Sequence, residues 1–149
     1  MIVNRQRSVR LERRRLELFL GRVREELGLG EAAVTVCFVS DAEIARMNEE
    51  YLKKKGPTDV LSFPAVARRK PVRLRRGVRA VRAREYLGDI AISPATAKRY
   101  AKKSERNLPI ELRVLILHGV LHLLGYDHET DHGEMARVEN RLRKRLGIA

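Results

Sequence analysis

The sequence predicts an α+β fold, in which a small mixed β-sheet packs against helices. Five segments carry apolar residues at helical spacing, and three shorter segments are rich in β-branched residues. These segments do not alternate strictly along the chain, which favours the α+β class. With 149 residues, the chain has the length of one domain, 1–149, that can bury a core without disulfide or metal staples.

The first half of the chain predicts two helices and two strands. Residues 10–27 carry apolar side chains at helical spacing, and the glycines that follow end the run. The segment "AAVTVCFVS" (32–40) has the β-branched content of a largely buried strand. Ser40 and Glu43 form a capping box that begins a second amphipathic helix. "TDVLSFP" (58–64) predicts a short strand closed by its proline.

The second half predicts one more strand and three helices. "YLGDIAIS" (86–93) has the pattern of a strand, and Ser93 followed by proline begins a helix. Residues 108–125 form the most apolar helix, which we expect to be central. Asp131 with Glu134 is expected to cap the last helix.

The composition indicates a soluble, cytoplasmic protein with an anionic partner. The single cysteine, Cys37, excludes a disulfide framework and a cysteine-based zinc cluster, and it favours a reducing compartment. The N-terminal stretch lacks the apolar block of a secretory signal, and the longest apolar run, 114–117, is far too short to cross a bilayer. The net charge of +13 points to nucleic acid first and to an anionic membrane surface second.

The positive charge is concentrated in one segment, residues 65–84, which we call the basic arm. It holds eight arginines and one lysine with no acidic residue, nine of the thirteen excess charges. "PVRLRRGVRAVR" alternates apolar residues and arginines, which predicts a hairpin turning at Arg76 and Gly77. Arginines suit phosphate, and the alternative is a solvated loop that only maintains solubility. The expected RNA contacts are Arg68, Arg69, Arg73, Arg75, Arg76 and Arg79.

Three of the four histidines lie within eleven positions. His118 and His122 share one face of the predicted helix, and Gly125 allows a left-handed turn that can return His128 to the same ion. Three imidazoles with an open fourth position are typical of catalytic zinc. The spacing matches zinc peptidases with a third histidine ligand, except that Gly119 replaces their glutamate base. Buried, hydrogen-bonded core histidines are the alternative.

The segments "HGVLHLLGYDH", "PTDVLSFP", "YLGDIAIS" and "DAEIARMNEEY" resemble, in order and spacing, the YbeY family of endoribonucleases. The resemblance covers roughly residues 34–140. It implies a zincin-like fold and one zinc ion held by His118, His122 and His128. It also implies cleavage of single-stranded RNA during maturation of the 16S ribosomal RNA 3′ end and in quality control, with the small ribosomal subunit as a partner.

One position departs from the family pattern. An arginine usually follows the tyrosine before the "PTDVLSFP" segment, and here that position is Leu52, followed by Lys53, Lys54 and Lys55. If the arginine binds phosphate, a neighbouring lysine must replace it with a point charge that lacks the bidentate fork. Lys53 is therefore a candidate catalytic residue.

Proton transfer needs a group other than the missing glutamate. Asp127, Asp59 and Glu129 are the nearest acids in sequence to the histidines and the strand. Each has a structural alternative: Asp127 orients an imidazole, Asp59 caps the strand entry, and Glu129 is solvated. Ser62 either lines the cleft or faces solvent, and His132 is expected at the surface.

Two other functions remain open from the sequence. A non-catalytic RNA-binding assembly factor with structural zinc fits the charge, and closure of the fourth coordination position by His132 or Asp131 would favour it. A zinc peptidase explains the histidine spacing but not Gly119, because its usual base for amide cleavage is absent.

Overall fold

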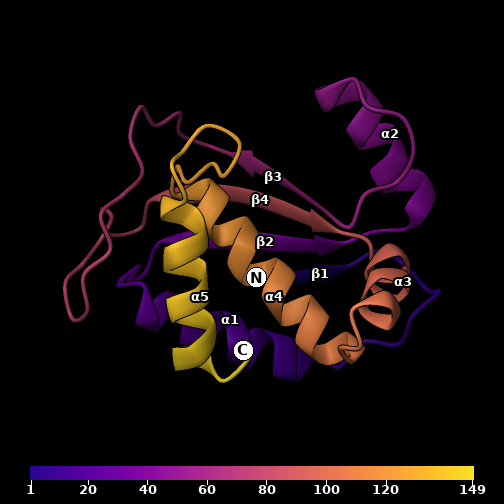
Figure 1. Ribbon diagram of the computed structural model, residues 1–149, viewed down its shortest axis with the longest axis horizontal. Coiled ribbons are helices and arrows are strands. Elements are labelled where there is room, and N and C mark those ends of the chain that lie inside the picture. The colour runs from indigo at the N-terminus through magenta and orange to yellow at the C-terminus, as the bar shows by residue number, and fades with distance from the viewer.

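The computed structural model describes all residues, 1–149. Its elements, in chain order, are β1 (Ile2–Asn4), α1 (Arg13–Glu26), β2 (Ala33–Phe38), α2 (Asp41–Leu52), β3 (Val60–Pro64), β4 (Tyr86–Ile92), α3 (Pro94–Lys103), α4 (Leu108–Leu123) and α5 (Glu134–Leu146) (Figure 1). The α+β class is confirmed, and every helix and strand expected outside the basic arm is present.

The four strands form one mixed sheet in the order β1-β2-β4-β3. β1, β2 and β4 are parallel to one another, while β3 runs antiparallel to β4. β3 is therefore an edge strand with one free side. The sequence reasoning missed β1, which spans only three residues and is held at the sheet edge by pairing with β2.

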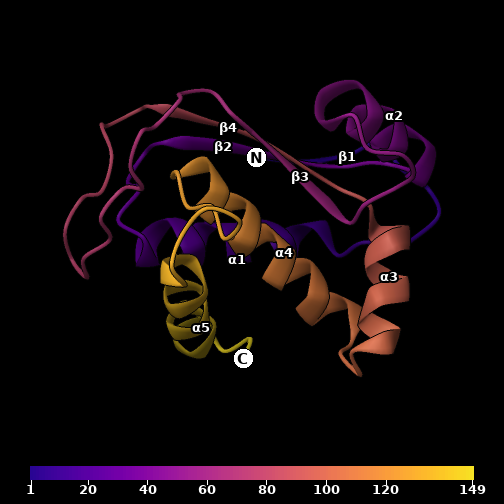
Figure 2. The same ribbon diagram turned by 45° about the horizontal axis from the view of Figure 1, so that its top comes forward.

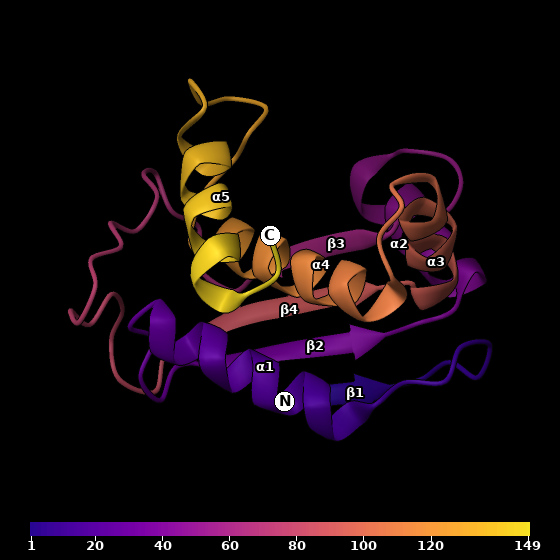
Figure 3. The same cartoon turned by 60° about the horizontal axis from the view of Figure 1, so that its bottom comes forward.

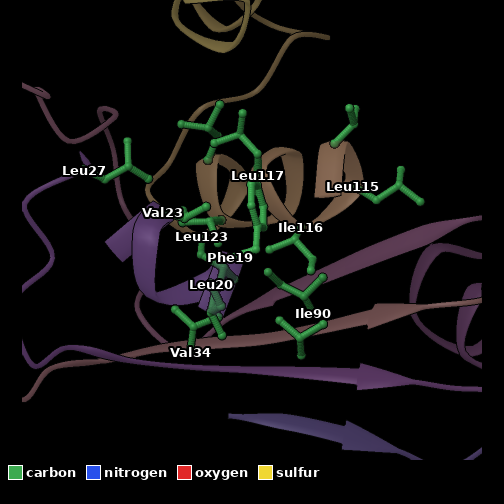
Figure 4. Packing of buried hydrophobic residues seen from close by; sticks show 14 of the residues in the cluster. Phe19, Leu20, Val23, Leu27, Val34, Ile90, Leu115, Ile116, Leu117 and Leu123 are labelled. Atoms are coloured by element: carbon green, nitrogen blue, oxygen red, sulfur yellow. The ribbon is translucent and has the colours of Figure 1, made fainter. Parts of the chain in front are cut away.

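Helices α1, α4 and α5 lie on one face of the sheet, as the turned views show (Figures 2 and 3). Their apolar faces and the inner face of the sheet form a cluster of 30 buried residues, part of which is drawn in Figure 4. α2 contributes Ile44 to a smaller cluster with Leu61 and Ala91 of the sheet. The sheet thus positions both α4 and α2.

α4 is the central helix, as predicted. Ten of its sixteen residues are buried, which explains why its sequence is apolar on nearly every side. It packs between the sheet, α3 and α5 (Figure 3). No helix of the structure combines the length and the apolar character that a membrane crossing requires.

Two helix starts differ in detail from the sequence expectation. The Ser40 hydroxyl accepts the amide of Glu43 at 3.2 Å, but the Glu43 carboxylate pairs with Arg5 at 2.7 Å and does not complete the box. At α5 the residue directly before the helix is Gly133, in a left-handed conformation, and not Asp131. The Asp131 carboxylate still caps the helix, because it accepts the first-turn amide of Met135 at 2.8 Å as well as the amide of Gly133 at 2.9 Å.

The hairpin expected in the basic arm was also wrong, because residues 65–84 include no strand. The main chain bonds to other parts of the protein: the amide of Val72 donates to Leu124 at 2.8 Å and that of Ala80 donates to Gly28 at 2.9 Å. Val72, Leu74 and Ala80 of the arm also pack against the core, and Val81 is buried. The arm is an anchored loop, seen at one end of the molecule in Figure 1.

Candidate metal centre and its cleft

The three predicted histidines converge at the C-terminal end of α4. One potential ligand atom from each of His118, His122 and His128 lies within 4.8 Å of the others. The Nε2 atoms of His118 and His122, one helical turn apart, are separated by 3.1 Å. The His128 ring centroid is 5.6 Å from that of His118 and 5.5 Å from that of His122. Three imidazoles therefore face one small volume.

The end of α4 brings the third histidine back. Gly125 has φ +95°, its amide donates to the His122 carbonyl at 3.0 Å, and the Tyr126 amide donates to the Leu121 carbonyl at 3.1 Å. This pair of bonds is the Schellman termination that a glycine after the last turn permits. The reversal returns His128 to the helix face that carries the other two ligands, as the spacing predicted.

Asp127 shapes the turn that carries His128. Its carboxylate accepts the amide of Glu129 at 3.0 Å, and its main-chain carbonyl accepts the amides of Thr130 at 3.3 Å and Asp131 at 3.1 Å. A short polar side chain that bonds its own backbone two residues on is a common device for such turns.

The carboxylate that orients an imidazole is Glu139 of α5, which the sequence reasoning missed. Its Oε1 and Oε2 lie 3.2 and 3.3 Å from Nδ1 of His118, and Arg143 donates to Oε1 at 3.3 Å. Burial alone would raise the pKa of Glu139, but its contacts with His118 and Arg143 hold that pKa below its usual value. The signal was present in sequence: Glu139 occupies the core-facing stripe between Met135 and Leu142.

The donor set fits a metal ion. The contact with Glu139 engages Nδ1 of His118 and leaves Nε2 for a ligand, as in carboxylate–histidine–metal arrangements. Burial, with help from His118, lowers the pKa of His122, so that this ring is neutral near pH 7 and its nitrogen is available to a cation. His132 is exposed, and neither it nor Asp131 belongs to the cluster. The three histidines can hold a metal with a coordination position left for another group.

The histidines open into a cleft of about 870 Å³ that runs along the free side of β3. The Ser62 hydroxyl of β3 donates to the Gly119 carbonyl of α4 at 3.3 Å, which joins this strand to the helix that carries His118 and His122. All three predicted acids line this cleft: Asp59, Asp127 and Glu129. Burial raises the pKa of Asp59. The acids therefore lie in the same cleft as the candidate metal ligands.

Only two cationic side chains apart from histidine line the cleft, Lys54 and Arg68. Lys53 does not: it adopts a left-handed conformation at the end of α2, and its ammonium group donates to the Glu50 carbonyl at 3.2 Å. Arg68 pairs with Glu85 at 2.8 Å, and both side chains are less than one fifth exposed, at 18% and 17%. The pair joins the first part of the basic arm to the residue that directly follows the arm, and Arg68 lines the cleft.

The other arginines expected to contact RNA are exposed and lie outside the cleft lining. They are Arg69, Arg73, Arg75, Arg76 and Arg79. The main chain of the arm is anchored to the end of α4 through Val72, and in Figure 1 the arm lies on the same side of the molecule as the loop between α4 and α5.

Gly119 is a glycine because α4 lies directly on the sheet at this point. A Cβ atom there would lie 2.8 Å from two carbons of the fully buried Ile90 side chain. A glutamate at this position would therefore clash with β4 and would not point into the cleft. The peptidase base is absent for a packing reason.

Comparison with known proteins identifies the family. The model of the family described as Endoribonuclease YbeY matches residues 1–147. The chain belongs to the YbeY family. Proteins named endoribonuclease YbeY from Koribacter versatilis and Solibacter usitatus are 39% and 38% identical to it, over 99% and 93% of this chain and 86% and 82% of theirs.

A solved structure supports the YbeY-family fold. The solution structure of TM1509 from Thermotoga maritima superposes with a TM-score of 0.63 at 25% identity, covering 98% of this chain and 89% of that one. The zincin-like architecture expected from the resemblance is therefore confirmed, with the histidine cluster at the end of the central helix.

Proposed function

We propose that this protein is a zinc-dependent endoribonuclease that cleaves single-stranded RNA. The observation that carries the proposal is the convergence of three imidazole nitrogens on an open cleft, in a chain of the YbeY family. Three histidines with a free coordination position are the ligand set of catalytic zinc, and this zinc would be one ion per chain.

The histidines, three acids and one lysine of the cleft each have a chemical role in this proposal. His118, His122 and His128 would hold the zinc, which would supply Lewis acidity for hydrolysis near neutral pH. Asp59, Asp127 and Glu129 line the same cleft and are the groups that accept and return protons there. Lys54, and not Lys53, is the lysine that offsets phosphate charge in the cleft.

In this proposal the basic arm supplies affinity for the RNA strand. Its exposed arginines bind phosphates outside the cleft, while Arg68 is held at the cleft wall by Glu85. This arrangement attracts any RNA and leaves selection of the cleavage point to the cleft. We further infer from the family that the substrate is ribosomal RNA at the 16S 3′ end, acted on within the small subunit in the cytoplasm.

The test is cleavage of defined RNAs by zinc-loaded protein and by the same protein treated with a chelator. The substrates are a single-stranded 16S 3′ precursor, its duplex form, the DNA of the same sequence, and intact precursor small subunits. We expect cuts only in single-stranded RNA and only with zinc. Tight RNA binding without cleavage of any substrate, intact subunits included, would contradict the proposal and favour an assembly factor.

A further inference from the structure

One exposed aromatic ring lines the cleft apart from the histidines and the acids. The chain has four tyrosines, three phenylalanines and no tryptophan. Of these, Tyr51, Phe63 and Tyr126 line the cleft. Tyr126 is buried, and its hydroxyl donates to the Val72 carbonyl at 2.8 Å. Tyr51, at the end of α2, is 60% exposed.

The Tyr51 ring contacts one other aromatic ring. The ring of Phe63 meets it edge to face, with centroids 5.2 Å apart and planes at 69°. Phe63 belongs to β3 and pairs with Asp89 of β4, so that its main chain is held in the sheet. An aromatic contact of this geometry orients the tyrosine ring and leaves most of it in solvent.

Two further apolar residues of the cleft lining are exposed. Leu52 is 50% exposed and Val66 is 41% exposed, and both line the same cleft. Large apolar groups gathered in a cleft, and not scattered singly over a surface, mark a binding site. Lys54 lies in the same lining, which adds a cation to the apolar surface.

We propose that Tyr51, with Phe63 behind it, is a stacking subsite for one unpaired nucleobase of the bound strand. A nucleobase joined to a phosphate matches a flat aromatic face beside a lysine, and single-stranded RNA exposes such bases for stacking on tyrosine. The inference rests on the proposed function only for the class of ligand. Stacking tolerates any base, so the subsite selects unpaired over paired nucleotides and not one sequence over another.

The experiment measures equilibrium binding of a fluorescently labelled single-stranded RNA in the presence of a chelator, so that cleavage does not enter. The variants are Tyr51→Ala and Tyr51→Phe. Tyr100→Ala is the matched control, because Tyr100 is 41% exposed and lies outside the cleft. Each protein is also tested against a strand of the same length in which every nucleotide is abasic, and its thermal unfolding is recorded.

We expect Tyr51→Ala to weaken binding of the intact strand roughly 5- to 150-fold, with Tyr51→Phe and Tyr100→Ala close to the parent protein. The defect should disappear for the fully abasic strand, because the parent protein then has no base to stack. Equal binding of the intact strand by Tyr51→Ala and the parent would overturn the subsite, as would an equal loss for the intact and the abasic strand. A failure of RNA cleavage leaves these binding results intact, so the two proposals fail separately.

Discussion

Nδ1 of His118 lies 3.2 Å from Oε1 of Glu139, a carboxylate on α5 that is 21 residues further along the chain. Glu139 is only 8% exposed, and Arg143 one turn later on α5 holds the same oxygen. The two helices therefore fix the orientation of one histidine ring before any ion binds. The metal centre is built by the packing of α5 on α4 as well as by the histidine loop.

Removal of this carboxylate should weaken metal binding. We expect Glu139→Ala to lower zinc affinity about 10- to 100-fold, because the His118 ring loses the partner that fixes its tautomer and direction. Glu139→Gln keeps a hydrogen-bond acceptor without the charge, so its zinc affinity should lie between those of the parent protein and Glu139→Ala. Competition with a chromophoric chelator measures the affinity. Glu134→Gln, exposed in the first turn of α5, is the control, and an equal loss there would refute a specific role for Glu139.

The close contact between α4 and the sheet makes Gly119 intolerant of any side chain. Alanine gains about 1 kcal/mol over glycine in a helix interior, but forcing a methyl group against Ile90 costs about 1 to 3 kcal/mol. We expect Gly119→Ala to lower the free energy of unfolding in urea, and Gly119→Ala with Ile90→Val to show favourable coupling. A Gly119→Ala protein more stable than the parent would show that the helix has room to move.

A second carboxylate, Asp41, joins the starts of α2 and α3. It accepts the hydroxyls of Ser93 and Thr96 at 2.6 Å each and pairs with Arg99 at 3.0 Å. Partial burial would raise the pKa of Asp41, but these donors hold it below the ordinary 3.8. Its stabilising contribution is therefore present above that value and is lost as the pH falls through the lower pKa of the folded state.

We expect Asp41→Asn to cost on the order of 1 kcal/mol of stability at pH 7, a value kept small because the carboxylate is partly solvated. The difference from the parent should shrink as the pH falls below 3.8. Chemical denaturation from pH 7 to pH 3 measures it. A difference that stays constant over this range would mean that the charge of Asp41 does not stabilise the fold.

The basic arm should govern the salt dependence of RNA binding. For a single strand, each phosphate that the protein neutralises steepens the fall of log K with log salt by about 0.7. We expect replacement of four arm arginines by glutamine, at Arg73, Arg75, Arg76 and Arg79, to make this slope shallower, measured by fluorescence anisotropy. A control of equal charge replaces the exposed cations Arg7, Arg13, Arg14 and Lys98. Equal slopes for the arm variant and the control variant would show that RNA binding depends on the net charge of the protein and not on the arm.

The parts of the site that the sequence predicted are local in the chain. His118, His122, Gly125 and His128 share one helix and one turn, so helical spacing and the left-handed preference of glycine predict their convergence. Glu139 escaped prediction because its partner depends on how α5 packs against α4. A buried glutamate on an amphipathic helix is visible in sequence, but the histidine that it contacts is not.

The hairpin expected in the basic arm and the choice of Lys53 for the cleft also depended on contacts that are distant in sequence or on local backbone geometry. The alternating arginines of the basic arm suggested two paired strands. In the structure the apolar residues 72, 74, 80 and 81 pack on the core, and the backbone amides of Val72 and Ala80 donate to carbonyls outside the arm. Among three adjacent lysines, the sequence offered no means of telling which one faces the cleft. The left-handed conformation of Lys53 at the end of α2 determines which lysine lines the cleft. The Lys53 ammonium group donates to the Glu50 carbonyl of its own helix, and Lys54 lies in the cleft lining.

The most direct test of the histidine centre compares zinc content and RNA cleavage in His122→Ala and His132→Ala. Both changes remove an imidazole from the same region, but only His122 belongs to the converging cluster, and His132 is exposed outside it. We predict that His122→Ala binds less than stoichiometric zinc and does not cut single-stranded RNA, whereas His132→Ala matches the parent in both. Full cleavage by zinc-free His122→Ala would contradict the claim that the histidine cluster is the catalytic centre.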